Sequence, residues 1–474
     1  MRKHSTPLSP GVANSQEQRI NIPMQGLMTR LGRWRSSENS HIVDLVRGTS
    51  VAGILKALAA VLSFGQNILL ARVLGASASG TYFLAITTGT IAATIGRVGL
   101  DSAVLRFVAT HASHNNWHDV RRVNSASLSI GFICCCVVAV VVYTLAGPLA
   151  TRAFSDPLLA TPLRIVAAAV VPLSLGVLVS QALLGLSHVR DALLVFSILP
   201  TGVALAAIWP LAERWGVDGA VAAYFIAVTI ALIYGILAWR RISAQYPTTA
   251  TDRDARSPSA DLLRSGVPLL IGALLQLVMQ MSGTLMLGVW ADNTEVSLFS
   301  VAYRTALLIT FVLTAVNTTA QAKFAALFAK RELDALAIMA NKATLLMTIS
   351  AAPVLAVFLI VPNFVMRVFG GDFIAGASTL QILSVGQFVN VAAGSVGVLL
   401  VMSGHEREYR NVQIVAACVV LVLNAILIPM YAAVGAAIAC AAALVVQNVL
   451  FGYFVWTKLG ILTFLPRRRP VHGT

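Results

Sequence analysis

Two basic residues lie inside long apolar stretches of the chain. Lys56 stands about seven residues into the stretch 49–73, and Arg304 stands about eight residues into the stretch 296–319. A charged side chain at such depth in a membrane is costly, so it usually faces a water-filled cavity. The alternative is that each long side chain snorkels toward the membrane surface. If the two cations line a cavity, they favour an anionic ligand such as a phosphate or pyrophosphate.

Polar side chains share helical faces with these candidates. Ser63 and Asn67 follow Lys56 at near-whole numbers of helical turns, and Gln276 and Gln280 form a similar stripe within the stretch 264–290. The face of Arg304 instead continues with apolar residues. Polar stripes also join helices to one another in membranes. We therefore predict substrate-binding roles for these residues and keep helix packing as the alternative.

The composition excludes an ordinary soluble protein. The chain has 474 residues, of which 57% are hydrophobic and 11% charged, whereas soluble domains carry roughly 25% charged residues. A membrane-spanning helix needs roughly 20 mostly apolar residues. Twelve stretches meet this length: 49–73, 79–98, 123–147, 160–186, 190–211, 216–239, 264–290, 296–319, 341–363, 375–403, 411–430 and 433–457. The sequence predicts an all-α polytopic membrane protein with about twelve transmembrane helices.

The positive charges predict the orientation of these helices. With the N-terminus in the cytoplasm, 27 of the 34 Lys and Arg residues fall on the inner side and five on the outer side. Inner loops carry the excess of Lys and Arg in membrane proteins. Both termini are therefore expected in the cytoplasm, and the net charge of +15 indicates contact with anionic membrane lipid rather than with nucleic acid.

The two halves of the chain repeat at an offset of about 216 residues. Gly219 corresponds to Gly435, and Arg106-Phe107 corresponds to Lys323-Phe324. Each half contains six spans, so the halves are parallel and related by an axis along the membrane normal. We expect two pseudo-symmetric six-helix lobes around a central cavity, an architecture typical of transporters. The predicted parts are a cytoplasmic polar tail (1–45), an N-terminal lobe (46–240), a cytoplasmic linker (241–262), a C-terminal lobe (263–460) and a basic cytoplasmic tail (461–474).

Arg106 and Lys323 occupy matching repeat positions at the predicted cytoplasmic side. They could capture an anionic phosphate at the mouth of the cavity by their charge. Anchoring at an anionic membrane surface would use the same charges.

Other chemistry finds no support in the sequence. No Gly-Lys-Ser or Gly-Lys-Thr is present for a nucleotide-binding loop, and no catalytic constellation stands out. The five cysteines lie in apolar runs without metal-ligand spacing. We expect no catalytic residues, no metal site and no cofactor, and hence a protein that is not an enzyme.

Several segments resemble a known family. They are ARVLGASASGTYFLA at 71–85, GLDSAVLRFVA at 99–109, and FGGDFIAGASTLQIL and LIPMYAAVGAAIA in the second half. They resemble the polysaccharide-biosynthesis (PST/Wzx-type) transporters of the MATE-like (MOP) flippase superfamily, from about residue 46 to 460. The resemblance implies a flippase that moves undecaprenyl-pyrophosphate-linked oligosaccharide across the bacterial inner membrane by alternating access, for exopolysaccharide, capsule or O-antigen synthesis. It also implies a cationic cavity for the headgroup, with Lys56, Arg304, Arg106 and Lys323 as candidates, and a polysaccharide polymerase or synthesis complex as partner.

Two other functions remain open. A MATE-like or major-facilitator antiporter for small molecules or drugs would share the two-lobed architecture. Related drug and cation antiporters generally use membrane-embedded carboxylates, and none is expected here. A non-transporting scaffold of a glycan-synthesis complex would need neither the repeat nor the polar stripes.

Overall fold

The computed structural model describes residues 24–246 and 258–461, which are almost entirely helical. The chain divides into a small unit, Met1–Val51, and a compact unit, Ala52–Thr474. In the small unit the backbone is helical from Met24 onward. Half of the predicted linker, most of the C-terminal tail and the first part of the N-terminal tail lie outside the described residues, so the predicted domain boundaries stay predictions.

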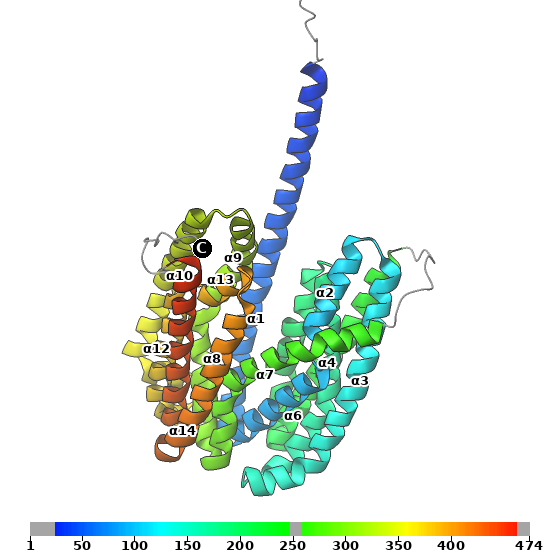
Figure 1. Ribbon diagram of the computed structural model, residues 1–474. Helices are drawn as coiled ribbons and strands as arrows, with labels where there is room; N and C mark the ends of the chain where they lie inside the picture. Colours follow the sequence, from blue (N-terminus) through cyan, green and yellow to red (C-terminus); the bar gives the residue numbers. More distant parts are fainter. Residues whose placement is uncertain (1–23, 247–257, 462–474) are drawn as a thin grey trace, which may run out of the picture. The chain divides into compact units, whose positions relative to one another are not determined.

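The N-terminal lobe consists of long helices joined by short turns (Figure 1). Its elements are α1 (Met24–Arg97), α2 (Leu100–Ser113), α3 (Trp117–Pro148), η1 (Leu149–Ala153), η2 (Pro157–Leu159), α4 (Ala160–Gly185), α5 (Val189–Leu193), η3 (Leu194–Ile198) and α6 (Leu199–Ala244). Closest packing joins α4 to α3 and α6, so α4 lies at the centre of this lobe.

The C-terminal lobe repeats this pattern with more interruptions. Its elements are α7 (Pro258–Trp290), α8 (Asn293–Ala306), η4 (Leu307–Thr310), α9 (Phe311–Ala329), α10 (Leu333–Ile360), α11 (Pro362–Arg367), η5 (Gly371–Gly376), α12 (Ala377–Ala393), α13 (Val396–Met402) and α14 (Glu406–Leu459). Here α12 is the central helix and packs against α10 and α14.

Nine segments of the described chain are long and apolar enough to cross a membrane. Three of them are roughly twice as long as one crossing requires, and each contains one residue with non-helical dihedrals: Gly75, Gly216 and Ala432. Dividing the three segments there gives twelve membrane-length helices. This number is consistent with the predicted twelve, and the predicted all-α, two-lobed membrane fold is confirmed.

The backbone carries the repeat that the sequence predicted. Gly216 (φ 56°, ψ −130°) and Ala432 (φ 44°, ψ −124°) break their helices in the same way and are 216 residues apart. The turn residues Asn115 (φ 57°) and Arg331 (φ 58°) are separated by the same offset. Three of these four residues are not glycine, and non-glycine residues rarely adopt a positive φ, so the shared offset supports a structural repeat.

Gly219 and Gly435 are equivalent in detail. A Cβ at Gly219 would lie 1.9 Å from the carbonyl oxygen of Leu211, and a Cβ at Gly435 would lie 2.2 Å from that of Leu427. Each glycine lets the chain return closely past the preceding helix. The sequence match between them therefore reflects a shared backbone geometry.

The buried cores distinguish two ends of the compact unit. We call the end with the turns at 114–116 and 330–332 the inner end, because the charge map predicts it to be cytoplasmic, and we call the opposite end the outer end. One large core cluster around the outer end combines residues of both lobes, including Phe83 and Phe299. Toward the inner end each lobe has a separate core, one around Leu100 and one around Phe324. The largest shared core thus lies at the outer end, while at the inner end the N-terminal part of α7 packs against the N-terminal lobe through Leu262 and Gly266.

Candidate functional site

Arg304 occupies the junction of the two lobes. It lies in the last turn of α8, and the 3₁₀ segment η4 interrupts the span directly after it. Its neighbours Val301, Ala302 and Thr305 are buried, yet its own side chain is exposed. The partial negative charge at a helix C-terminus favours a cation in this position. Arg304 is therefore a solvent-accessible cation in the interior of the protein.

The guanidinium of Arg304 meets an aromatic wall. Its carbon lies 4.9 Å from the ring centroid of Phe83, which belongs to the other lobe. Tyr82, Tyr224 and Tyr303 lie within electrostatic reach of the same charge. A desolvated cation–π contact stabilises by about 2 kcal/mol, and an exposed one by about 0.5–1 kcal/mol. The ring contact positions the side chain and leaves its N–H donors available to an anion.

Arg97 supplies a second cation that the sequence analysis did not select. It ends α1 and interacts electrostatically with Tyr224, as Arg304 does. Its Nη2 donates to Thr94 Oγ1 at 2.9 Å, and its Nε lies 3.7 Å from Asp101 Oδ2. The buried Nε has no hydrogen-bond partner among the described residues. Arg97 is thus partly neutralised by Asp101 and retains an unused donor.

Lys56 is half-buried on α1, together with Ser63 and Asn67. In the described part of the chain no carboxylate lies within ion-pair distance of Lys56 or Arg304. Asn67 Nδ2 donates to the carbonyl oxygen of Ser63 at 2.8 Å, so this amide is partly used within its own helix. The adjacent face of α1 borders an apolar crevice of about 360 Å³, which Leu308 and other apolar residues complete. Whether Lys56 faces a cavity stays a prediction.

Gln276 and Gln280 are both exposed on α7. Gln276 Oε1 accepts a hydrogen bond from Gln413 Nε2 at 3.1 Å. The polar stripe of α7 is therefore connected to a second polar region inside the C-terminal lobe, on α14.

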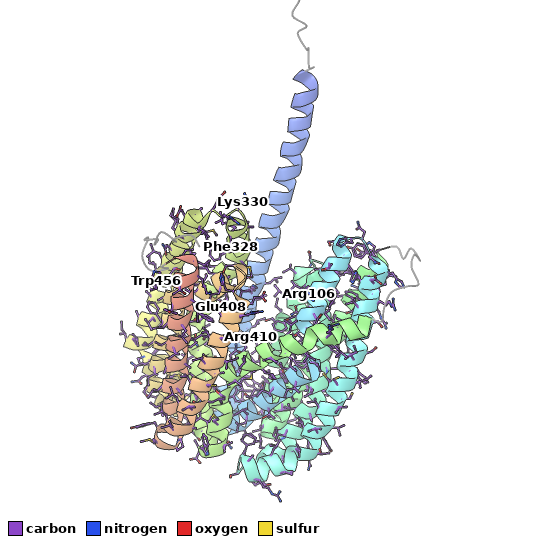
Figure 2. The ribbon with its side chains drawn as sticks, in the orientation of Figure 1. Arg106, Phe328, Lys330, Glu408, Arg410 and Trp456 are labelled. Atoms are coloured by element: carbon purple, nitrogen blue, oxygen red, sulfur yellow. The ribbon has the colours of Figure 1, made fainter. Side chains whose placement is uncertain are left out.

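Arg106 and Lys323 are exposed toward the inner ends of their lobes. Figure 2 shows Arg106 on the N-terminal lobe, and its Nη2 donates to Ser265 Oγ at 3.3 Å. Its guanidinium also lies 5.2 Å from the ring centroid of Phe107. These contacts leave both interpretations of the pair open, so its role in phosphate capture stays a prediction.

The outer end is held shut by polar contacts between the lobes. Asn293, at the start of α8, donates through Nδ2 to Asp156 Oδ2 at 2.8 Å and to Thr81 Oγ1 at 3.1 Å. Arg72 Nε donates to the carbonyl oxygen of Val368 at 2.8 Å. Gly80 contacts the Asn293 backbone so closely that a Cβ would lie 1.8 Å from its carbonyl oxygen. Together with the large core that both lobes share there, this arrangement corresponds to a state closed on the outer side.

Known structures share this fold across most of their length. The lipid II flippase MurJ in an inward closed conformation superposes with a TM-score of 0.69 at 12% identity, covering 85% of this chain and 87% of that chain. An inward-facing multidrug resistance MATE family transporter of the MOP superfamily gives 0.66 at 16% identity, covering 85% and 94%. A MOP superfamily transporter from Pyrococcus furiosus gives 0.59 at 16% identity, covering 87% and 95%. These likenesses identify the fold.

Sequence comparison adds the family. No curated protein sequence matches the chain significantly. The family model described as "Polysaccharide biosynthesis protein" matches residues 45–321, which is more than half of the chain. The match includes the segment Ala71 to Tyr82 that carries the predicted resemblance, and it extends past Arg304 and the outer contacts of Asn293. The chain is a multi-pass membrane protein with a MOP-type transporter fold, and it belongs to the polysaccharide biosynthesis protein family.

Proposed function

We propose that the protein is a flippase that moves undecaprenyl-pyrophosphate-linked oligosaccharide repeat units across the bacterial inner membrane, for exopolysaccharide, capsule or O-antigen synthesis. The observation that carries the proposal is Arg304. It is an interior, solvent-accessible cation between two lobes, without a carboxylate partner in the described chain. Because an arginine forms strong charge-assisted bonds with phosphate oxygens, this position suits a pyrophosphate headgroup.

Alternating access supplies the movement in this proposal. The outer contacts of Asn293 close one side, while the separate lobe cores lie at the other. A cargo made in the cytoplasm would enter from the inner end with its polyprenyl tail in the surrounding lipid. Opening the outer contacts would then release the headgroup outside, where a polysaccharide polymerase or synthesis complex would receive it.

The cargo's charge separates this proposal from a drug antiporter. A cationic substrate would be repelled by Arg304 and Arg97, and among the described carboxylates only Asp101 offsets that charge, through its contact with Arg97. In this function the protein moves the cargo without changing its covalent bonds, so it acts as a transporter and not as an enzyme.

A binding experiment tests the proposal. The purified full-length protein in lipid nanodiscs is titrated with undecaprenyl pyrophosphate, and we expect Arg304→Gln to weaken binding by at least about 10-fold, which corresponds to ~1.4 kcal/mol. Arg304→Lys should retain part of the affinity because the charge remains. Arg164→Gln is the matched control, since Arg164 also lies over an aromatic ring, that of Tyr143 at 5.8 Å, but is exposed outside the junction. Equal binding by wild type and Arg304→Gln would contradict the proposal, and tight binding of a cationic dye such as ethidium would favour the antiporter.

Topology is tested separately. The proposal places both termini and the segment between the lobes in the cytoplasm. Reporter fusions after residue 250 and after residue 470 should both report a cytoplasmic location, and a periplasmic signal from either would overturn this orientation.

A further inference from the structure

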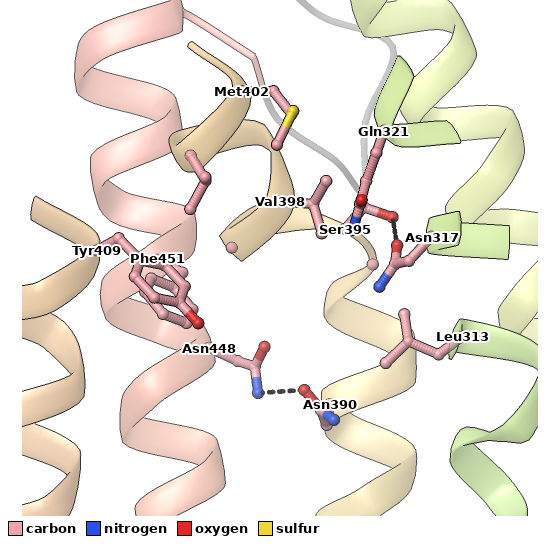
Figure 3. Close-up of a pocket in the computed structure, with 13 residues that line it drawn as sticks. Leu313, Asn317, Gln321, Asn390, Ser395, Val398, Met402, Tyr409, Asn448 and Phe451 are labelled. Carbon is pink, nitrogen blue, oxygen red and sulfur yellow. Dashed lines mark hydrogen bonds between the residues drawn. The ribbon is translucent and has the colours of Figure 1, made fainter. Parts of the chain in front are cut away.

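The C-terminal lobe contains a second polar region, separate from Arg304. A pocket of about 270 Å³ lies between α9, the break that separates α12 from α13, and α14 (Figure 3). Its polar lining consists of Asn317, Gln321, Asn390, Ser395, Tyr409 and Asn448. No charged residue lines it within the described chain. We call it the amide pocket.

Three of the four amides are held by hydrogen bonds, and free bonding capacity remains. Asn448 Nδ2 donates to Asn390 Oδ1 at 3.1 Å, and Ser395 Oγ donates to Asn317 Oδ1 at 2.5 Å. Among the described residues, the amide nitrogens of Asn317 and Asn390 and the whole amide of Gln321 have no partner. Because a carboxamide offers two donors and an acceptor, the pocket can still bond several hydroxyl groups.

One wall of the pocket is aromatic. The rings of Tyr409 and Phe451 are stacked, with centroids 5.1 Å apart and an interplanar angle of 7°. Gly397 faces them, and a Cβ there would lie 3.3 Å from Tyr409 and 3.4 Å from Phe451. Gly397 therefore packs closely against the rings, and a side chain there would press on them. An apolar wall opposite oriented amides is the usual composition of a small-molecule site.

Irregular backbone also borders the pocket. The span that contains α12 and α13 is interrupted at Gly394, which has a φ of 77°, and at Ser395. Non-helical backbone inside a membrane protein is tolerated where it is buried in protein or lines a cavity. Discontinuous helices of transporters often mark substrate sites for this reason.

The internal repeat indicates that the fold does not require most of these polar residues. At the offset of 216 residues, the N-terminal lobe has apolar side chains at four of the six equivalent positions: Leu105 for Gln321, Val179 for Ser395, Leu193 for Tyr409 and Leu232 for Asn448. The other two are polar, with Asp101 for Asn317 and Ser174 for Asn390. A buried polar group that lacks a partner costs about 1–3 kcal/mol. One lobe thus fills four of these positions with apolar packing, while the other accepts polar groups that need partners.

The amide pocket is connected to the predicted substrate stripe. Gln413 donates to Gln276 on α7 and also to the Tyr409 hydroxyl at 3.1 Å, and it accepts from Gln447. A chain of side-chain hydrogen bonds therefore runs from the exposed Gln276 to the aromatic wall of the pocket.

We propose that the amide pocket binds one neutral sugar ring of the transported glycan, with the ring hydroxyls bonded by the amides and its C–H face against the aromatic wall. The volume is slightly below the usual range of small-molecule sites, about 300–1,000 Å³, which suits one ring rather than an oligosaccharide. The uncharged lining disfavours both a phosphate and a cation. This inference rests on the proposed function, in which the cargo carries a glycan.

The test measures sugar binding and anion binding on the same protein. Full-length protein in nanodiscs is titrated by saturation-transfer NMR with the methyl glycosides of glucose, galactose, mannose, N-acetylglucosamine and N-acetylgalactosamine, and separately with undecaprenyl pyrophosphate. We expect saturable binding of at least one glycoside, weakened at least about 10-fold by Asn448→Leu, which introduces the residue of the other repeat. If Asn448→Leu does not fold, Asn390→Ser, which likewise introduces its repeat counterpart Ser174, is the second variant.

The two proposals fail in different ways. Arg304→Gln should leave glycoside binding unchanged, and Asn448→Leu should leave undecaprenyl pyrophosphate binding unchanged. If no glycoside binds, or if binding is insensitive to the pocket variants, the amide pocket is not a sugar site, whatever the pyrophosphate result. If the glycoside behaves as expected but Arg304→Gln binds pyrophosphate normally, the sugar site stands and the headgroup assignment fails.

Discussion

Gly80→Ala should force the lobes apart at the outer end. Gly80 on α1 meets the backbone of Asn293, and an added Cβ would lie 1.8 Å from the Asn293 carbonyl oxygen. Real Cβ atoms essentially never approach a neighbour within 3.0 Å, so the two backbones must separate by about 1.2 Å. Because the obstacle is backbone, a change of rotamer cannot relieve it.

The size of the effect follows from the contacts that such a shift breaks. Asn293 would lose its hydrogen bonds to Asp156 at 2.8 Å and to Thr81 at 3.1 Å. A bond to a charged group contributes about 1.5–3 kcal/mol and a neutral one about 0.5–1.5 kcal/mol. A destabilisation of the outer-closed state by ~2–4 kcal/mol shifts its population relative to an outer-open state by roughly 30- to 700-fold.

Distances between spin labels measure this shift. Labels at Thr151 and Asp372, both exposed at the outer end, are introduced into a variant without the five native cysteines. Gly65→Ala is the matched control, since Gly65 also lies on α1, before the break at Gly75, and a Cβ there meets nothing within 4 Å. We expect a longer distance distribution for Gly80→Ala only. An unchanged distribution in a folded Gly80→Ala protein would refute the idea that this contact closes the outer side.

Other predictions concern the cations and the repeat. Lys56→Glu should abolish glycan export at normal membrane abundance while Lys56→Arg retains part of it, because a reversed charge repels an anionic headgroup; normal export by Lys56→Glu would indicate snorkelling. Neutralising Arg106 and Lys323 together should lower export at unchanged abundance, whereas unchanged export would favour membrane anchoring. Ala432→Gly should raise the thermal stability and Gly216→Ala should lower it, each by ~1 kcal/mol, because both positions have positive φ; melting curves that move in the same direction would contradict their equivalence.

The architecture could be predicted because it depends on quantities that the sequence carries locally. Apolar length determines which segments can cross a membrane, and similarity at a constant offset identifies the repeat. The breaks at Gly75, Gly216 and Ala432 agree with the predicted span boundaries within a few residues. Each of these breaks lies where one predicted apolar stretch ends and the next begins, so its position follows from the local sequence alone.

The environment of Arg304 could not be predicted in the same way. Apolar residues continue its helical face, which favoured snorkelling, but η4 interrupts that face directly after α8. The aromatic wall comes from Phe83 in the other lobe. Arg97 stands at the end of a predicted span, and the turn into α2 keeps it mostly buried beside Asp101. Contacts between distant helices decide all three features.

The amide pocket was missed because its residues are uncharged and widely separated. Asn317, Asn390 and Asn448 come from α9, α12 and α14, and each alone is an unremarkable polar residue in an apolar helix. A search of the sequence for charged residues within apolar stretches does not find these asparagines. Gln276 was selected from its stripe on α7, but only the fold connects it through Gln413 to these residues.

The comparison of the two lobes separates residues that the backbone requires from residues that it does not require. Where the repeats agree, as at Gly219 and Gly435, the shared feature is a backbone constraint that both lobes must satisfy. Where the repeats differ, as at Leu232 and Asn448, the backbone tolerates either residue. The presence of a polar side chain at Asn448 is therefore explained by function and not by the fold. A lipid-linked glycan has a charged pyrophosphate and neutral hydroxylated rings. The protein offers a cation at the lobe junction and a neutral amide pocket in one lobe, and two chemically distinct sites of this kind would discriminate such a cargo from a simple anionic lipid.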